Sequence, residues 1–284
     1  EKKTVIYAQG IGPVKNKIYK WLIKKVFAKI NIISVRDRYS RDRLVSWGVK
    51  KEDIIITVDP VFALKKSKVN KKVLTKDIKK MKRPDRNLIG VSVKNWNNNS
   101  YLNELVNTIL KMIKKTKSDI LIIPMYFEQD QEVNLKLKEM IEKKVINKFD
   151  KGSDDLLNNN LNIEILKNKC EPLEMLKKFN ELDFFLGVRL HSIIYAALCN
   201  VPFVALEYDP KVEGFIHNIG INCGISMEDI DEGKLLMVSE AIWENREQFQ
   251  RILKTKGNIF YKNAIGNAVM VMNLLGDKIG ECNE

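Results

Sequence analysis

Cysteine and histidine are scarce in this sequence. Its 284 residues include two histidines and four cysteines, and the cysteines form no CxxC pair and have no histidine at metal-ligand spacing (Cys170, Cys199, Cys223 and Cys282). This pattern argues against a disulfide framework and a zinc site, and we predict no metal. Cys199 and Cys223 lie in apolar stretches, which predicts buried thiols. Because nothing indicates disulfides, we expect a cytoplasmic protein.

Long apolar runs are absent as well. No segment has the roughly 18 consecutive apolar residues that a membrane-spanning helix needs, so we predict that no helix crosses a membrane. We expect no signal peptide, because the sequence starts at Glu1 and enters a predicted strand, Thr4–Ala8, within a few residues. Such a start is typical of the middle of a domain, and we expect an upstream piece to be missing.

Acidic residues are outnumbered by basic ones. The sequence has 49 Lys and Arg against 36 Asp and Glu, a net charge of +13, and several lysines gather on a predicted helix between Lys15 and Lys29. Such an excess favours an anionic partner: nucleic acid, an acidic membrane surface or a phosphorylated substrate. Charge alone does not choose among these, and a lysine-rich face is also typical of any solvated surface.

Strands alternate with helices along nearly the whole chain, which predicts parallel α/β units. The length is enough for two domains, and we expect two Rossmann-like domains that face each other across a cleft. The first would cover residues 1–82 with a lysine-rich linker, and would lack its first units. The second would cover residues 83–265 and would end its sheet at the strand Val201–Leu206. A C-terminal helix, residues 266–284, would pack back on the first domain.

The most informative segment leads from a predicted strand into a helix and contains Arg189 and His191. The next strand leads to Lys211, which we expect in a turn at the same edge of the sheet. Ligands of open α/β sheets bind outside the carboxyl ends of the strands, so these side chains predict an anion site beside helix N-termini. The alternatives are a hydrogen-bonded core histidine, a surface arginine and a solvated lysine.

A second candidate region follows the N-terminal strands. Gly10 and Gly12 lie in a strand-to-helix turn, where the backbone either approaches a ligand or simply turns tightly, and the third glycine of a dinucleotide fingerprint is missing. Arg36 follows the strand Ile32–Val35 and is expected to face the cleft; the alternative is a surface ion pair with its neighbour. Asp37 or Ser40 is expected to cap the following helix.

Taken together, these motifs resemble the polysaccharide pyruvyltransferase family. Five segments spread over nearly the whole chain carry the resemblance: Tyr7–Pro13, Ser34–Asp37, Thr57–Pro60, Gly187–Ser192 and Tyr208–Val212. The resemblance implies a GT-B-like α/β fold with two Rossmann-like domains, and phosphoenolpyruvate as donor without a further cofactor. Within the family, the motifs are most similar to bacterial enzymes that form a pyruvate ketal on N-acetylmannosamine of secondary cell-wall polysaccharide.

The resemblance also implies roles for individual residues. The catalytic residues would be His191, Arg36 and Lys211, and phosphoenolpyruvate would bind Arg189, Leu190, Arg36 and Lys211. Gly10, Gly12 and Asp59 would belong to a loop of the cleft. The acceptor would be a lipid-linked saccharide, and we expect peripheral binding to the anionic inner face of the cell membrane and no nucleic-acid partner. The family's glycine-rich N-terminal unit is missing, and Glu207 departs from the family pattern.

Other roles stay open at this point. A GT-B nucleotide-sugar glycosyltransferase would share the fold and would need a carboxylate for the ribose, for which Glu207 and Glu213 are the candidates. A non-catalytic basic module that binds acidic polymer would explain the charge, but it gives His191 beside Arg189 no purpose. Within a pyruvyltransferase, His191 would be either the general acid and base or a ligand of the phosphate.

Overall fold

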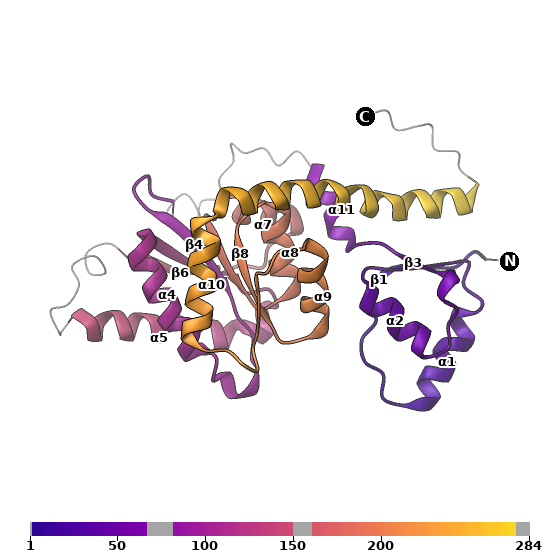
Figure 1. Ribbon diagram of the computed structural model, residues 1–284, viewed down its shortest axis with the longest axis horizontal. Helices are drawn as coiled ribbons and strands as arrows, with labels where there is room; N and C mark the ends of the chain where they lie inside the picture. Colours follow the sequence, from indigo (N-terminus) through magenta and orange to yellow (C-terminus); the bar gives the residue numbers. More distant parts are fainter. Residues whose placement is uncertain (1, 67–81, 150–160, 277–284) are drawn as a thin grey trace. The chain divides into compact units, whose positions relative to one another are not determined.

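The computed structural model describes residues 2–66, 82–149 and 161–276. The chain divides into two compact units, of which unit 1 comprises Glu1–Ser67 with Thr255–Glu284 and unit 2 comprises Lys68–Lys254. Both units are α/β structures with parallel sheets (Figure 1). Most of the predicted lysine-rich linker lies outside the described residues. The predicted boundary at residue 265 falls inside one continuous helix, α11.

Unit 1 has a three-stranded parallel sheet in the order β1-β2-β3. Its elements are β1 (Val5–Gln9), α1 (Lys17–Phe27), β2 (Ile32–Val35), α2 (Arg38–Ser46), η1 (Lys51–Asp53), β3 (Ile54–Ile56) and η2 (Pro60–Lys66). The core of this unit forms around buried Val35 and Leu44, against which Ile23 and Phe27 of α1 pack. The helices therefore cover one face of the sheet through their apolar positions.

The second half of α11 (Arg246–Leu275) belongs to unit 1. The ring of Phe260 meets that of Phe62 edge to face, with 4.9 Å between the centroids. Thr57 donates to the carbonyl of Asn263 at 3.0 Å and accepts from the buried amide of Asn267 at 2.7 Å. Apolar packing and a buried polar network thus join this helix to the segment that follows β3.

Unit 2 has a six-stranded parallel sheet in the order β6-β5-β4-β7-β8-β9. The strands are β4 (Asn87–Ser92), β5 (Ser118–Ile122), β6 (Ile163–Ile165), β7 (Phe184–Gly187), β8 (Phe203–Glu207) and β9 (Gly224–Ser226). Numbered along the chain, this is the doubly wound order 3-2-1-4-5-6, and the direction of winding reverses between β4 and β7. The prediction that Val201–Leu206 ends the sheet is wrong, because β9 pairs with the outer side of β8.

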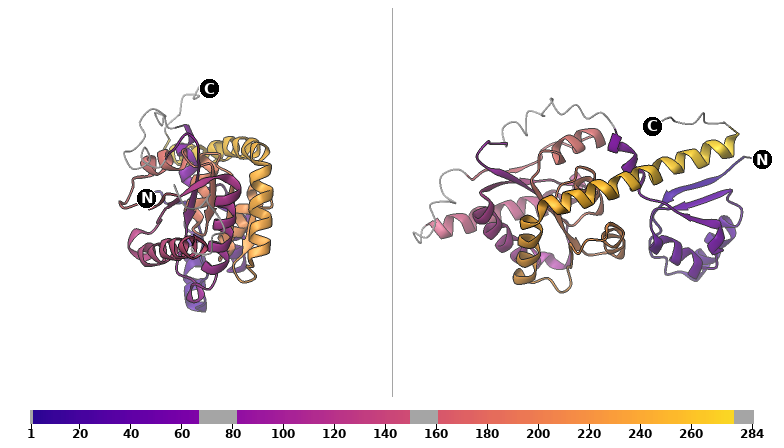
Figure 2. Two further views of the ribbon diagram at one scale, coloured as in Figure 1. Left: turned by 90° about the vertical axis from the view of Figure 1, so that its left-hand side faces the viewer. Right: turned by 45° about the horizontal axis from the view of Figure 1, so that its top comes forward.

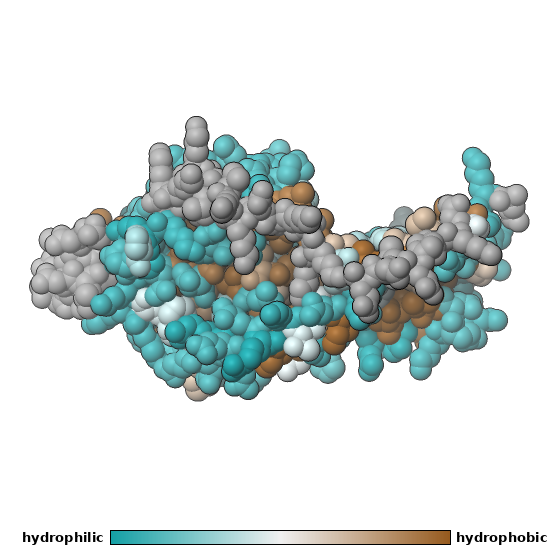
Figure 3. Space-filling model, turned by 90° about the horizontal axis from the view of Figure 1, so that it is seen from above, coloured by the Kyte–Doolittle hydropathy of each residue, from teal (hydrophilic) through white to brown (hydrophobic). Residues whose placement is uncertain are grey.

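Helices lie on both faces of this sheet (Figure 2). They are α4 (Leu102–Thr116), α5 (Phe127–Phe149), α7 (Pro172–Phe179), α8 (Leu190–Leu198), α9 (Pro210–Ile219), α10 (Glu232–Glu244) and the start of α11. Helix α4 packs against α5 and α10, and α7 packs against α8. The face drawn in Figure 3 is mostly hydrophilic, with smaller apolar patches. Within the described ranges, no helix has both the length and the apolar composition to cross a lipid bilayer.

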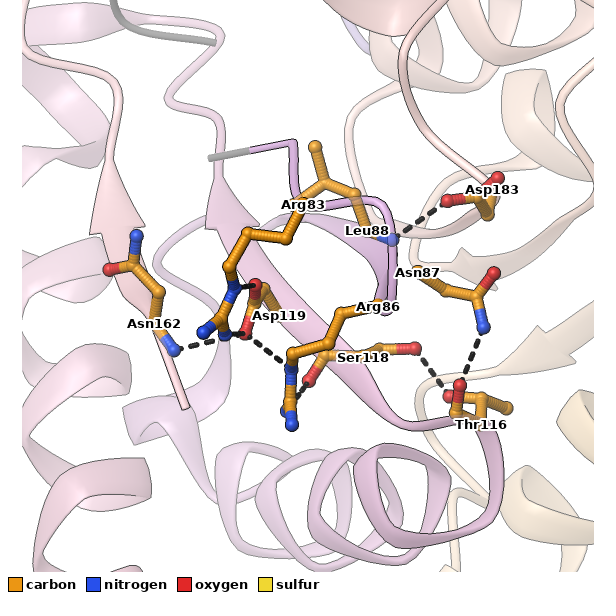
Figure 4. Close-up of polar contacts among 9 residues, drawn as sticks. All are labelled: Arg83, Arg86, Asn87, Leu88, Thr116, Ser118, Asp119, Asn162 and Asp183. Atoms are coloured by element: carbon orange, nitrogen blue, oxygen red, sulfur yellow. Dashed lines mark hydrogen bonds and ion pairs between the residues drawn. The ribbon is translucent and has the colours of Figure 1, made fainter. Parts of the chain in front are cut away.

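A buried ionic cluster joins the amino ends of β4, β5 and β6 (Figure 4). Asp119 is fully buried and accepts from Arg83 Nε at 2.8 Å, from Arg86 Nε at 3.0 Å and from the backbone N–H of Asn162 at 3.0 Å. Asp183 accepts from the N–H of Leu88 at 2.8 Å. Because these charged groups pair with one another, they hold the strand starts in place, and the chemistry is left to the carboxyl edge.

Candidate functional site

The carboxyl ends of β4 and β7 meet where the winding of the unit 2 sheet reverses. Ser92 and Gly187 are in register at the ends of these strands, and Lys94 and Arg189 follow each of them by two residues. The buried hydroxyl of Tyr101 donates to the carbonyl of Lys94 at 2.7 Å and accepts from its N–H at 3.2 Å. The backbone of Lys94 is therefore fixed at the position where doubly wound sheets bind ligands.

Arg189 is held by a buried carboxylate of α5. Asp130 is fully buried and accepts from Arg189 Nε at 3.1 Å and from Nη2 at 2.5 Å, and it also accepts from the N–H of Tyr126 at 3.1 Å. The Tyr126 ring lies 4.4 Å from the guanidinium carbon. The two parallel hydrogen bonds to Asp130 and the contact with the Tyr126 ring fix the orientation of the Arg189 guanidinium.

Lys211 and Tyr208 complete the group of cations. The Lys94 Nζ lies 3.8 Å from the centroid of the Tyr208 ring, and the Lys211 Nζ lies 5.8 Å from it. Burial lowers the pKa of Lys94, and the positive charges of Arg189 and Lys211 lower it further. Three cations thus share one small region with two carboxylates, because Asp130 pairs with Arg189 and Asp209 Oδ2 lies 3.4 Å from Lys211 Nζ.

The first turn of α8 opens into the same region. Its N-cap residue, Arg189, makes no side-chain cap, and the Arg189 carbonyl accepts from the N–H of Ser192 at 2.9 Å. The neighbouring helix α9 differs, because Asp209 caps it by accepting from the N–H of Lys211 at 3.0 Å and Pro210 has no N–H. An anion is therefore favoured at the start of α8, where the helix dipole and the cations act together.

Two of the predicted site residues belong to that first turn. Leu190 is buried by its side chain, so only its backbone is suited to a ligand. His191 follows it and is half-buried. Lys211 lies in the first turn of α9, which starts at Pro210, and not in a loop turn as expected. Unit 2 thus brings Arg189, Leu190, His191 and Lys211 to one edge of its sheet.

The loop after Lys94 has an unusual backbone. Asn97, Asn98 and Asn99 all have positive φ angles, of 38°, 53° and 62°. The Asn99 side chain accepts from the N–H of Trp96 at 3.0 Å and donates to the Asn95 side chain at 3.0 Å, which stabilises the turn. Left-handed conformations cost free energy in residues other than glycine, and asparagine tolerates them best. The loop is thus held in one shape beside the cations.

In unit 1, Arg36 lies at the carboxyl end of β2. Its Nη1 donates to Asp59 Oδ2 at 3.1 Å, and its Nε lies 3.4 Å from Asp37 Oδ2. A Cβ on Gly10 would come within 2.6 Å of the guanidinium carbon, whereas one on Gly12 would meet open space. Gly10 is therefore needed for the close approach of Arg36. The sequence alone does not place Arg36 with the unit 2 cations, so its membership of their site stays a prediction.

The turn that contains Gly10 is anchored on α2. Asp37 caps this helix by accepting from the N–H of Ser40 at 2.6 Å, which settles the choice between the two predicted caps. Ser40 Oγ instead accepts from the N–H of Ile11 at 2.9 Å, and Arg43 donates to the carbonyl of Ile11 at 3.1 Å. The structure therefore gives Ser40 and Arg43 a role in shaping the turn.

Glu207, which departs from the family pattern, has a local explanation. Its carboxylate occupies the space that a side chain on Gly224 would need. Burial raises the pKa of Glu207, and the negative charge of Glu213 raises it further. Glu207 is thus packed over β9, a strand that was not predicted from the sequence.

Other parts of unit 2 suit an anion less well. A groove of about 480 Å³ lies between α5 and β6, and Glu139, Glu142 and Glu164 are among its lining residues. Lys138 and Lys167 line the groove as well, so carboxylates and cations are mixed there. Within the part of the chain that the structure describes, no three His, Cys, Asp or Glu side chains gather as metal ligands.

Lys94, Asp130 and Tyr126 were not predicted as site residues. Lys94 follows a buried strand just as Arg189 does, but it is one of 49 basic residues in the sequence. Asp130 and Tyr126 gave no such signal, because their contacts with Arg189 join residues about sixty positions apart in the chain. Only the fold brings these groups together.

Solved structures with a similar fold include epimerases and a glycosyltransferase. They include a putative UDP-N-acetylglucosamine 2-epimerase from Listeria monocytogenes (TM-score 0.61, 11% identity, covering 89% of this chain and 62% of that chain). A glycosyltransferase from Rickettsia africae gives a TM-score of 0.61 at 13% identity, and the match covers 95% of this chain and 70% of that chain. The UDP-GlcNAc 2-epimerase from Neisseria meningitidis bound to UDP-GlcNAc gives a TM-score of 0.60 at 14% identity. This match covers 96% of this chain and 70% of that chain. These likenesses confirm the predicted α/β, GT-B-like fold with Rossmann-like units.

The chain spans about 62% of the length of the Listeria epimerase, so it matches only part of such a protein. No protein of curated function matches the sequence. The sequence model of one protein family, described as polysaccharide pyruvyl transferase, matches residues 1–210. This match includes all the predicted site residues except Lys211, and the family is one of transferases. The chain belongs to the polysaccharide pyruvyl transferase family, as its motifs predicted.

Proposed function

We propose that this protein is a pyruvyltransferase that moves the enolpyruvyl group of phosphoenolpyruvate to a β-N-acetylmannosamine residue of a lipid-linked cell-wall polysaccharide precursor. The products are a pyruvate ketal and phosphate. One observation supports the donor most directly: Lys94, Arg189 and Lys211 gather at the uncapped start of α8. The family of the chain supports the reaction class.

The charge of the donor fits this group of cations. Phosphoenolpyruvate carries a carboxylate and a phosphate, about three negative charges in a small volume, and each cation that it meets is worth more in a partly buried site than in water. Because Nε and Nη2 of Arg189 already bind Asp130, Arg189 would meet the anion with its remaining N–H groups, while the lysines act as compact point charges. The amides at the start of α8 add donors for the phosphate.

The proposed chemistry balances with the donor and the acceptor alone. A proton added to the CH2 carbon of the donor gives a methyl group and an oxocarbenium-like carbon, which one sugar hydroxyl attacks as it loses its proton. The C–O bond to phosphate then breaks, a second hydroxyl attacks the same carbon, and phosphate leaves with the remaining proton. His191, in the first turn of α8, would move these protons or bind the phosphate.

The remaining predicted residues are proposed to act from unit 1. Arg36 would contribute to donor binding, although Asp37 and Asp59 already offset its charge. Gly10, Gly12 and Asp59 would shape the loop beside it. We propose that the enzyme works in the cytoplasm on the anionic inner face of the cell membrane, where a lipid-linked acceptor is found.

A turnover assay tests this function. The purified protein is incubated with phosphoenolpyruvate and a β-N-acetylmannosaminyl acceptor, and phosphate release and ketal formation are measured. Arg189→Ala and His191→Ala should each lower kcat/KM roughly 100-fold or more while the protein stays folded. The matched controls are Arg246→Ala and His217→Ala, because both residues are exposed helical surface residues of unit 2.

The same assay separates the rival functions. No turnover of phosphoenolpyruvate together with turnover of a UDP-sugar would favour a nucleotide-sugar glycosyltransferase. Binding of acidic polymer without any turnover would favour a non-catalytic module. Normal rates in Arg189→Ala would show that the cations of unit 2 are not the donor site.

A further inference from the structure

Helix α1 carries an apolar ridge that faces solvent. Its apolar positions divide into two sets, and Ile23 and Phe27 pack against the core of unit 1. Ile18, Leu22 and Val26, four residues apart, have exposed fractions of 65%, 44% and 55%. Tyr19 and Trp21 are exposed beside them, and no residue of α1 is buried. Five large apolar side chains on one short helix form a patch that a solvated surface does not need.

The charge around this ridge has a single sign. Six lysines lie on α1 and its two ends: Lys15, Lys17, Lys20, Lys24, Lys25 and Lys29. No aspartate or glutamate occurs anywhere from Lys2 to Arg36, although the whole chain has 36 of them. The positive charge is therefore not compensated by carboxylates of the same segment, and the patch favours a partner with a dense negative charge.

We propose that α1 is the surface through which this protein binds an anionic lipid bilayer. A helix that carries six lysines together with exposed Trp, Tyr, Leu and Ile side chains has the composition of helices that lie in the membrane interface. Tyrosine and tryptophan are enriched at the level of the lipid headgroups, and Tyr19 and Trp21 would lie there in the bound protein. The Lys25 ammonium lies 5.8 Å from the Trp21 ring, which places a charge beside an aromatic side chain.

The charge favours a membrane over a second copy of this chain. Two α1 surfaces in contact would bring together two sets of six lysines, and such like-charge contact opposes association. An anionic bilayer instead attracts each lysine near its surface, and it accepts apolar side chains without a matching pocket. The inference rests on the membrane partner that the proposed function includes, and it names the contact surface.

Co-sedimentation with vesicles tests the inference. The purified protein is mixed with vesicles of phosphatidylcholine, or of phosphatidylcholine and phosphatidylglycerol, at low and high salt. Binding should require phosphatidylglycerol and weaken with salt. Leu22→Glu should lower the partition coefficient roughly tenfold or more, because it removes an inserted side chain and adds a repelled charge. The control is Met237→Glu, which adds the same charge at an exposed apolar residue of unit 2. It should lower the partition coefficient much less than Leu22→Glu, because it removes no inserted side chain.

Three results would overturn the inference. The first is a wild-type protein that does not bind anionic vesicles. The second is vesicle binding that Leu22→Glu and the double charge reversal Lys25→Glu/Lys29→Glu leave unchanged. The third is a dimer, seen by light scattering, that Leu22→Glu dissociates without a change in vesicle binding. Turnover of a water-soluble acceptor should be equal in the wild type and Leu22→Glu, so failure of this inference is distinct from failure of the proposed function.

Discussion

The contact between Asp130 and Arg189 gives the sharpest prediction. Asp130→Asn keeps the volume of the side chain and one oxygen acceptor, but it removes the negative charge opposite a guanidinium that is 14% exposed. One of the two charge-assisted hydrogen bonds is lost, which costs about 1.5–3 kcal/mol, and Arg189 loses the carboxylate that pairs with its charge. Both effects together should lower the free energy of unfolding by about 3 kcal/mol, at the lower end for a broken buried ion pair.

The effect on turnover should differ from the effect on donor affinity. Without Asp130 the fork of Arg189 is no longer held in one orientation, and a displacement of about 1 Å can cost roughly 100-fold in rate. The site also becomes more positive, so the affinity for the donor should not fall. We therefore expect kcat to drop roughly 100-fold with little rise in KM for phosphoenolpyruvate.

Steady-state kinetics and urea unfolding check both parts. Glu142→Gln is the control on the same helix, because Glu142 forms an exposed pair with Lys138 at 3.6 Å that is worth about 0–1 kcal/mol. A variant Asp130→Asn with normal kcat and reduced stability would show that Asp130 only supports the fold. Unchanged stability would refute the energetic argument itself.

Three further predictions follow from the same structure. Because burial and two neighbouring cations lower the pKa of Lys94, KM for phosphoenolpyruvate should rise as the pH increases through that lowered pKa. Lys94→Arg should remove this rise, since a guanidinium stays charged. The same dependence of KM on pH in the wild type and in Lys94→Arg would contradict the role of Lys94. Asp119→Asn should lower the free energy of unfolding by about 3–5 kcal/mol in denaturant titrations, and a loss below about 1 kcal/mol would show that the cluster is not a coupled buried network. Gly10→Ala should cost about 1–3 kcal/mol because its methyl group would meet Arg36, while Gly12→Ala should be close to neutral, and equal unfolding midpoints would count against the contact.

The sequence predicted the fold where strands are buried on both faces. The prediction of Ile32–Val35 is confirmed, because buried parallel strands are continuous apolar runs. Strand β9 was missed because Gly224–Ser226 has a single apolar residue and is defined by its pairing with β8. A run this short gives no periodic signal.

Helix starts were predictable in principle but were not all recognised. Helix α9 begins at Pro210 behind the cap of Asp209, and a proline after an aspartate is a common helix start. Aspartate followed by proline is also common in turns, and the sequence was interpreted that way. Lys211 was consequently placed in a turn, whereas the structure places it in the first turn of a helix.

The candidate site was predicted as far as chain order allows. Arg189 and Lys211 follow buried strands, and the rule for parallel sheets brings them to one edge. The sequence did not reveal that Asp130 orients Arg189 or that Tyr208 lies beside both lysines, because these contacts join distant parts of the chain. The burial that lowers the pKa of Lys94 is likewise a property of the fold.

The composition of unit 1 from two distant segments has a consequence for biosynthesis. Strands β1 to β3 leave the ribosome early, but Phe260 and Asn267, which pack against Phe62 and Thr57, are made only after the whole of unit 2. Unit 2 is nearly continuous in sequence and can close its sheet as it emerges, whereas unit 1 must wait with an incomplete core. We expect the nascent chain to fold out of order, with the later unit first, and its N-terminal segment to be the part that depends most on chaperones.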